Sequence, residues 1–345
     1  MALKQETINC LNAYADRQAE INNVSTEVVE KGLKFAVTPQ VQYEWAARLS
    51  TPTGFLSEVD IDTCEDQIIE QLGFAEPGLV SSTTDTKGGT ARDPSNLGGP
   101  DAVQYTLVKI NHDTYVTFDE LNKLARKSDQ FQVRLGQLRL ESKRLDIMRI
   151  GFNGVKHSKT SDKKTYPLGQ DVAIGWLQRV RDNAPEHNMT ETVAGSGKVK
   201  VGKGQKHTSI DQLVVDAVSL IPEQYRSGLK IYVSNDLMVD RQMKLIEKST
   251  VTEIGKEITQ EAYYTINGLT ATTPAFFPSG TLMITAPKNL AIRIQEGSQR
   301  SSNKVQDELD RYVMFSQANE CFAVKNYEGI VLVENIVIED ASTGD

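Results

Sequence analysis

The sequence predicts an α+β fold, in which helices and strands are mixed without the regular alternation of a doubly wound sheet. Two observations support this prediction. Apolar side chains recur every three or four residues between positions 117 and 152, and short alternating strand patterns lie on both sides of that stretch. The 345 residues are enough for about two domains.

The N-terminal segment combines a weak helical pattern with a less regular region. Residues 3–21 have apolar side chains at helical spacing on a polar background, which predicts a helix that needs a partner surface. Residues 22–39 contain Gly32 and Pro39 and show little periodicity, so we expect a linker or extended arm. Short apolar runs between residues 55 and 79 predict an exposed strand.

A long polar stretch at residues 81–100 separates two predicted strands. Of its 20 residues, 11 are Ser, Thr or Gly and none is aromatic, so the stretch cannot pack a core. Residues 103–110 alternate in the manner of a strand. Two strands that flank a long polar tip indicate an extended two-stranded arm, and a loop of this length indicates a function.

The clearest predicted element is a long helix from Thr117 to Ile150, which we expect to end at Gly151. Thr117 and Glu120 have the spacing of a capping box. A helix of about 33 residues would be about 50 Å long. The expected inward positions are Leu121, Leu124, Ser128, Phe131, Leu135, Leu138, Ser142, Leu145, Met148 and Phe152.

Elements after the long helix are shorter. We expect helices at 171–181, 209–220 and 236–247, a loop or β-excursion at 189–207, and strands at 229–234, 282–285, 290–294, 311–317, 320–326 and 329–338. Ser209 has the position of an N-cap. The strands at 282–285 and 290–294 are separated by a turn that contains a Pro-Lys-Asn sequence.

The net charge of −8 conceals an uneven distribution. Residues 121–206 contain 18 basic and 8 acidic residues, a net of +10, so the rest of the chain carries −18. Many of these cations lie on the long helix, where they form either a solvated face or a surface that contacts phosphates. The helix lacks interleaved aromatic residues, so recognition of bases is not expected.

Signals for chemistry are weak. The cysteines and histidines do not have metal-ligand spacing, and we expect a reduced environment, no metal, no cofactor and no enzymatic activity. Neither a signal sequence nor a membrane-spanning run is recognisable, so no membrane contact is expected. The segment Gly197–Gly204 matches a phosphate-binding loop except for its final hydroxyl residue, so a soluble nucleotide-binding enzyme is an alternative of another class.

Several segments resemble, in the same order, the major capsid proteins of P2-like tailed bacteriophages (peduoviruses). They are SSTTDTKGGT from Ser81, GFNGVK from Gly151, TSD from Thr160, QDVAIGWLQ from Gln170, VGKG from Val201, and PAFFP, LMIT and NLAI between Pro274 and Ile292. The resemblance covers nearly the whole chain, so it is more specific than any single motif.

This resemblance implies the HK97-like phage capsid fold. Residues 1–54 would form an N-arm whose helix interacts with scaffold and is cleavable, and residues 55–110 an E-loop that reaches over a neighbouring subunit. Residues 111–164 and 295–345 would form the peripheral domain with the long spine helix, and residues 165–294 the axial domain.

The implied function is that of a structural major capsid protein, which self-assembles into the icosahedral shell around the double-stranded DNA genome of a tailed phage. Its partners would be copies of itself in pentamers and hexamers, a scaffolding protein and protease, a portal protein, and packaged DNA through non-specific contacts. Its location would be the virion capsid, after assembly in the host bacterial cytoplasm. An encapsulin-like or satellite-element shell protein of the same fold is the alternative.

Three groups of site residues follow from this resemblance. Intersubunit contacts of the E-loop tip are expected at Thr86, Lys87, Arg92 and Asp93. Contacts to DNA on the interior are expected at Lys123, Arg126, Lys127, Arg134, Lys143 and Arg144. Proteolytic processing is expected within Glu30, Lys31, Gly32, Leu33, Lys34 and Phe35.

Overall fold

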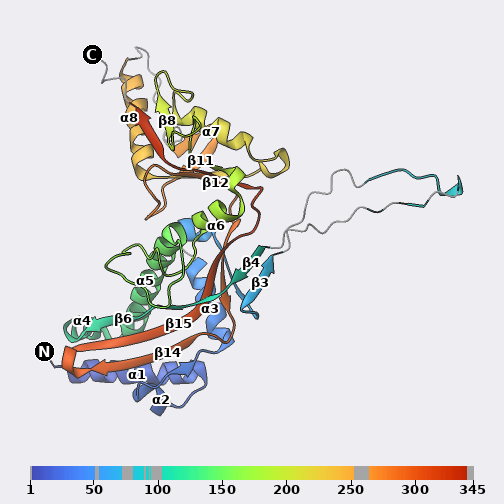
Figure 1. The fold of residues 1–345 in the computed structure, drawn as a ribbon. Coiled ribbons are helices and arrows are strands. Elements are labelled where there is room, and N and C mark those ends of the chain that lie inside the picture. The colour runs from blue at the N-terminus through green and yellow to red at the C-terminus, as the bar shows by residue number, and fades with distance from the viewer. Residues whose placement is uncertain are drawn as a thin grey trace.

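The computed structural model describes residues 2–50, 54–71, 81–88, 91–92, 94, 103–251 and 264–339. Two sheets with their own helices lie at opposite ends of the body, and a two-stranded arm leaves it at the side (Figure 1). Helices and strands are mixed without regular alternation, so the predicted α+β class is confirmed.

The first sheet has seven strands and is organised around one long strand, β15. Its strands are β1 (Phe35–Ala36), β2 (Asp60–Cys64), β5 (Val108–Asn111), β6 (Thr114–Thr117), β13 (Leu290–Gln295), β14 (Arg300–Gln306) and β15 (Arg311–Val324). The two strands expected at 311–317 and 320–326 are therefore one. The polar residues Gln317 and Asn319 mark the place where β15 changes its partner from β14 to β13, not the end of a strand.

The second sheet has six strands. They are β7 (Asn188–Met189), β9 (Lys230–Val233), β10 (Thr265–Ile266), β11 (Leu269–Thr272), β12 (Leu282–Thr285) and β16 (Ile330–Val333), and beside them β8 (Val199–Gly202) pairs with β17 (Ile336–Glu339). The turn between β12 and β13 does not close a hairpin, because it carries the chain from the second sheet to the first.

The two sheets do not follow the expected division at residues 294 and 295. Strand β13 lies in the first sheet, whereas β16 and β17, which come later in the chain, lie in or beside the second sheet. All four residues of β16 are buried, between β12 and β7. The backbone N–H and C=O groups of a buried strand need hydrogen-bond partners on both edges, and the second sheet supplies them.

Besides the long helical region, the described part of the body contains the α-helices α1 (Gln5–Asn22), α2 (Thr26–Glu30), α3 (Pro39–Ser50), α6 (Trp176–Asn183), α7 (Ile210–Ser219) and α8 (Asn235–Val251). It also contains the short 3₁₀ segments η1 (Phe55–Glu58), η4 (Pro185–His187), η5 (Glu223–Tyr225) and η6 (Asp307–Leu309). The predicted cap of α7 is confirmed, because the Ser209 side chain accepts the Gln212 backbone N–H. Helix α3 was not predicted. Its Pro39 was interpreted as a breaker, whereas proline is favoured at the first position of a helix.

The prediction of a single long helix is wrong in one respect, because the helix is interrupted. The structure has α4 (Phe118–Leu124), the 3₁₀ segment η3 (Ala125–Gln130) and α5 (Phe131–Asn153), and Lys127 leaves helical geometry at φ −120° and ψ 74°. The capping box at Thr117 and Glu120 is confirmed. The break lets Phe131 and Leu135 pack against α1, while Leu138, which a continuous helix would turn inward, is 54% exposed.

The end of α5 crosses the start of α6 at very short range. A Cβ placed on Gly151 would lie 2.2 Å from Cζ3 of Trp176, and one on Gly154 would lie 2.1 Å from the carbonyl oxygen of Ala173. The Trp176 indole is fully buried and donates to the backbone oxygen of Ala291 at 2.9 Å. Gly151 therefore does not end the helix as expected; it allows the indole to approach. This crossing lies in the largest apolar cluster, which includes residues of both sheets.

Candidate functional site

The side arm begins with a short antiparallel ladder between β3 (Ile68–Gln71) and β4 (Val103–Thr106). The predicted two-stranded arm is confirmed by this ladder. At its base Tyr105 is buried, and its hydroxyl donates to the backbone oxygen of Val324 in β15 at 2.8 Å. Residues 81–88 and 91–92 lie far from both sheets (Figure 1). The arm is thus anchored in the first sheet and carries its outer residues away from the body.

Three of the four predicted tip residues are described. Thr86 and Lys87 lie in a 3₁₀ turn, η2 (Thr86–Gly88), in which the Asp85 carboxylate accepts the Lys87 backbone N–H at 2.9 Å. Thr86, Lys87 and Arg92 are exposed. Asp93 lies outside the described residues. The outer arm therefore presents two cations to the surroundings.

The six predicted DNA-facing cations divide into two groups. Lys123, Arg126, Lys127 and Arg134 lie together on α4, η3 and the start of α5, and no carboxylate of the described chain is within 4.0 Å of their charged nitrogens. By contrast, Lys143 donates to the buried Glu320, and Arg144 contacts Glu141 and the backbone oxygen of Arg48. Within the described chain, only the first group has charged nitrogens without a carboxylate at ion-pair distance, so only these cations can pair with an external anion.

A buried charge cluster links α5 to the first sheet. The Glu320 side chain is 1% exposed, and its carboxylate lies 2.7 Å from Lys143 Nζ and 3.4 Å from His112 Nε2. Burial alone would raise the pKa of the Glu320 carboxyl, but the charges of Lys143 and His112 and their hydrogen bonds lower it to about 2. Sequence reasoning missed this cluster, although a glutamate directly before the apolar run Cys321–Val324 was a usable signal.

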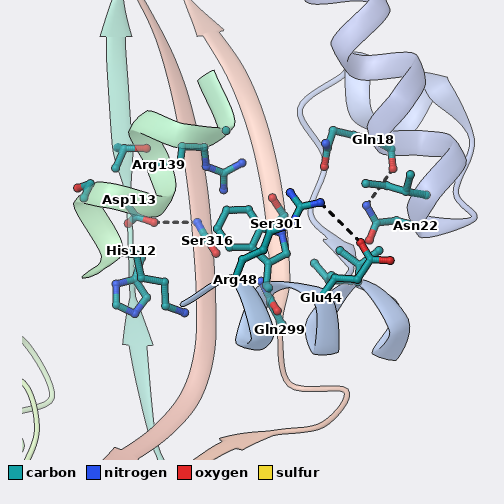
Figure 2. A pocket seen from close by; sticks show the side chains of 18 of the residues that line it. Gln18, Asn22, Glu44, Arg48, His112, Asp113, Arg139, Gln299, Ser301 and Ser316 are labelled. Atoms are coloured by element: carbon teal, nitrogen blue, oxygen red, sulfur yellow. Dashed lines mark hydrogen bonds and ion pairs between the residues drawn. The ribbon is translucent and has the colours of Figure 1, made fainter. Parts of the chain in front are cut away.

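A cavity of about 560 Å³ lies between the N-terminal helices, α5 and the first sheet. Figure 2 shows His112, Asp113, Ser301 and Ser316 along it, which are the residue types of a hydrolytic relay. Their contacts differ from such a relay, because His112 pairs with Glu320 and Asp113 accepts the backbone N–H of Ser316 at 3.2 Å. The geometry of these residues is that of structural contacts.

The predicted processing region lies between α2 and β1. Glu30, Lys31, Leu33 and Lys34 are exposed, whereas Phe35 is buried and pairs with Ser301 in β14. Gly32 has a φ of +66°, and the N–H groups of Gly32 and Leu33 donate back to the end of α2, so the helix closes with a Schellman motif. The residues from Glu30 to Lys34 are therefore largely accessible to solvent, and Phe35 is not.

Helix α1 already has a partner within the chain. Its Leu11 and Tyr14 pack with α4, α5 and β15, and its buried Thr7 hydroxyl donates to the Asn122 side chain at 2.6 Å. The sequence predicted that this helix needs a partner surface, and the subunit itself provides one.

The Gly197–Gly204 segment is not arranged as a phosphate loop. The Glu191 carboxylate accepts the N–H groups of Gly195 and Gly197 at 3.0 and 2.9 Å, so an anionic side chain occupies the amides that would face a phosphate. The segment continues into strand β8, and the next helix begins only at Ile210. These contacts do not support the nucleotide-binding alternative.

No group of three or more His, Cys, Asp or Glu side chains in the described ranges is placed to hold a metal ion. None of the helices in those ranges is both long and apolar enough to span a bilayer.

Comparison with known proteins identifies relatives over the full length. The family described as "Phage major capsid protein, P2 family" matches residues 10–336. The capsid protein of Escherichia phage P2 is 33% identical, and the match covers 99% of this chain and 97% of that one. The major capsid protein of Serratia phage KSP20 is 27% identical, with 98% and 99% covered. A chain from the procapsid of satellite phage P4, solved with its size determination (Sid) protein, has a TM-score of 0.78 at 31% identity, with 99% and 100% covered.

Proposed function

Because this chain belongs to the P2 family of phage major capsid proteins, it is a structural shell protein of a tailed phage, and we propose that its copies form the pentamers and hexamers of an icosahedral shell around double-stranded DNA. It has the HK97-like fold. Closed shells of identical subunits need contacts that every copy repeats. The observation that best supports the proposal is the side arm, anchored by Tyr105 and carrying Lys87 and Arg92 away from the body.

In this proposal the arm is the E-loop, residues 1–54 act as the N-arm, and the two sheets belong to the peripheral and axial domains. Thr86, Lys87, Arg92 and Asp93 contact a neighbouring subunit in the shell. Cations at the end of an arm form contacts that are specific in position but individually weak, which favours reversible assembly.

Replacing residues 86–92 with a short Gly-Ser linker is expected to abolish or sharply reduce closed shells, because the contacting side chains are removed while the β3 and β4 ladder remains. Electron microscopy of the assembly products measures the effect. An unchanged circular dichroism spectrum of the subunit is the control for folding. Closed shells in undiminished yield would contradict the role of the tip.

The four available cations, Lys123, Arg126, Lys127 and Arg134, are proposed to face packaged DNA. Phosphate contacts by Lys and Arg release counterions, so binding weakens with salt in proportion to the number of contacts. Lys143 and Arg144 are left out of this surface because their charges are engaged within the subunit.

The double variant Arg126→Gln/Lys127→Gln is expected to reduce the salt dependence of binding to a DNA duplex, with the slope of log K against log salt falling by about 0.9 for each lost contact. Fluorescence anisotropy at several salt concentrations measures it. The matched control is Lys198→Gln/Lys203→Gln, which removes two exposed lysines from the loop around β8. Equal slopes for the two variants would exclude a special role for the η3 cations.

We also propose that a scaffolding protein contacts the outer polar face of α1, and that a phage protease cuts within Glu30–Phe35 during assembly in the host cytoplasm. The accessible position of Glu30, Lys31, Leu33 and Lys34 supports this location. Intact mass spectrometry is expected to find that chains from assembled particles begin within residues 31–35, while chains expressed alone keep α1. Particles that contain only full-length chains would contradict processing.

Two further parts of the proposal concern the assembly as a whole. A portal protein is expected to replace one pentamer of the shell. The similarity to a chain of a satellite phage procapsid favours, as a second candidate, a shell of the same fold that serves a satellite element. Measured particle diameters with and without a satellite's size-determining protein distinguish the two.

A further inference from the structure

Leu138 is exposed in a position where the sequence pattern predicts burial. Its side chain is 54% accessible, although it follows Phe131 and Leu135, both fully buried, at helical spacing. All three residues lie on helix α5, which begins after the break at Lys127 (Figure 1). A single exposed leucine is ordinary on a protein surface, so the surroundings of Leu138 decide whether it has a role.

Two hollows meet at Leu138. Both hollows, of about 530 and 500 Å³, are bordered by Leu124, Arg134 and Leu138. The first continues over Tyr115, Val116 and Met314, and the second over Leu140. Tyr115 is 58% exposed. We call the two together the α4–α5 groove; its apolar lining includes Leu124, Leu138 and Met314, and Leu138 borders both parts.

The rim of this groove is basic. Lys123 and Arg134 border it, and within the described chain neither has a carboxylate within ion-pair distance. Its acidic members are already engaged, since Glu120 caps α4 and Glu141 lies 3.3 Å from Arg144. The hydrogen bonds from the Thr117 backbone and side chain lower the pKa of Glu120, and the charge of Lys123 lowers it further. Lys123 is therefore partly balanced by Glu120, and Arg134 is the rim cation on which the charge argument mainly depends.

We propose that the α4–α5 groove is a docking site for an acidic amphipathic helix of another protein. Two adjoining hollows that share Leu124 and Leu138 can receive successive apolar side chains, which a helix presents at spacings of three and four residues. The unpaired cations at the rim match acidic side chains that flank such an apolar stripe.

The apolar lining separates this proposal from DNA binding. DNA contacts at Lys123 and Arg134 would require cations alone and would gain nothing from Leu138 or Tyr115. A second copy of this chain is also less suited, because a basic rim would meet the same basic rim across a two-fold contact. The charge and the lining therefore favour a partner that is acidic and amphipathic.

The test uses the full-length subunit and a fluorescein-labelled synthetic helix of about 18 residues, with leucines at three-and-four spacing and glutamates elsewhere. Fluorescence anisotropy is expected to show saturable binding that weakens with salt. Leu138→Gln should weaken it by about tenfold, equivalent to about 1.4 kcal/mol, because the exposed part of the leucine would be buried in the complex. Arg134→Gln should weaken it severalfold and flatten the salt dependence.

Matched controls are Val193→Gln, whose side chain is 66% exposed on another part of the chain, and the exposed Lys109→Gln. Neither should change the affinity. A second peptide with lysines in place of the glutamates should not bind. Leu138→Gln should keep the thermal midpoint of the subunit, since the side chain is 54% exposed.

Three results would overturn the proposal. They are no saturable binding of the acidic peptide, binding that Leu138→Gln leaves unchanged, and self-association of the subunit that Leu138→Gln abolishes. Binding of a DNA duplex that depends on Arg134 but not on Leu138, without peptide binding, would assign the surface to DNA alone. Because binding is measured on the isolated subunit and shell closure by microscopy, failure of the groove and failure of the assembly function are distinguishable.

Discussion

Glu320→Gln is expected to lower the free energy of unfolding by about 3–5 kcal/mol, because it leaves a largely buried ammonium group without its partner. Lys143 is 13% exposed and Glu320 is 1% exposed, so the ammonium group has only limited contact with solvent. Urea denaturation of the unassembled subunit, followed by tryptophan fluorescence, measures the change. The effect should be mostly in the midpoint, with the slope unchanged.

The matched control is Glu141→Gln. Glu141 also pairs with an α5 cation, but its side chain is 63% exposed, so the expected loss is below about 1 kcal/mol. The double variant Glu320→Gln/Lys143→Met should recover much of the stability, because no unpaired charge remains. A loss for Glu320→Gln no larger than that for Glu141→Gln would show that the cluster contributes little.

The same cluster predicts a dependence on pH. The pKa of Glu320 is lowered to about 2 in the fold from an ordinary value of 4.5. A lowered carboxyl pKa stabilises the fold fully above the ordinary value, and this contribution is lost as pH falls through the folded value. The stability difference between the natural chain and Glu320→Gln should therefore shrink between pH 4.5 and about 2.

Gly151→Ala is expected to destabilise the subunit by about 3 kcal/mol or more, the upper part of the range for overpacked cores. The new Cβ would lie 2.2 Å from Cζ3 and 2.5 Å from Cε3 of Trp176, and the indole is fully buried, so it has no free space to move into. Thermal unfolding of the unassembled subunit measures the loss.

Gly136→Ala is the matched control on the same helix. No atom lies within 4 Å of its added Cβ, so only the intrinsic preference for helix changes. That variant should gain about 0.5–1 kcal/mol. Equal effects at the two positions would mean that the crossing of α5 and α6 can accommodate an added methyl group, contrary to the short distances at Gly151.

The elements that local patterns predicted well are those whose signals lie within a few residues. The capping box at Thr117 and Glu120, the N-cap at Ser209, and the buried strand β9 depend on neighbouring side chains and were predicted from them. The resemblance through GFNGVK and QDVAIGWLQ also has a physical basis, because Gly151, Gly154 and Trp176 meet at one crossing.

The elements that patterns missed depend on contacts far apart in the chain. The break at Lys127 follows from packing of α5 against α1, and a three-and-four spacing continues through it without a visible interruption. Leu138 keeps the periodicity of an inward position but is 54% exposed in the fold. The buried position of Glu320 arises from Lys143 and His112, which lie 177 and 208 residues away.

The sequence by itself determined the α+β class, the two-stranded arm, the uneven charge and, through its motifs, the capsid family. The tertiary structure decided which strands join which sheet and which cations remain available. The physical reason is that alternation and charge are properties of local segments, whereas strand partners and buried ion pairs depend on residues brought together only by folding. For that reason the predicted basic face was reduced to the four cations at Lys123, Arg126, Lys127 and Arg134, with Lys143 and Arg144 engaged inside the subunit.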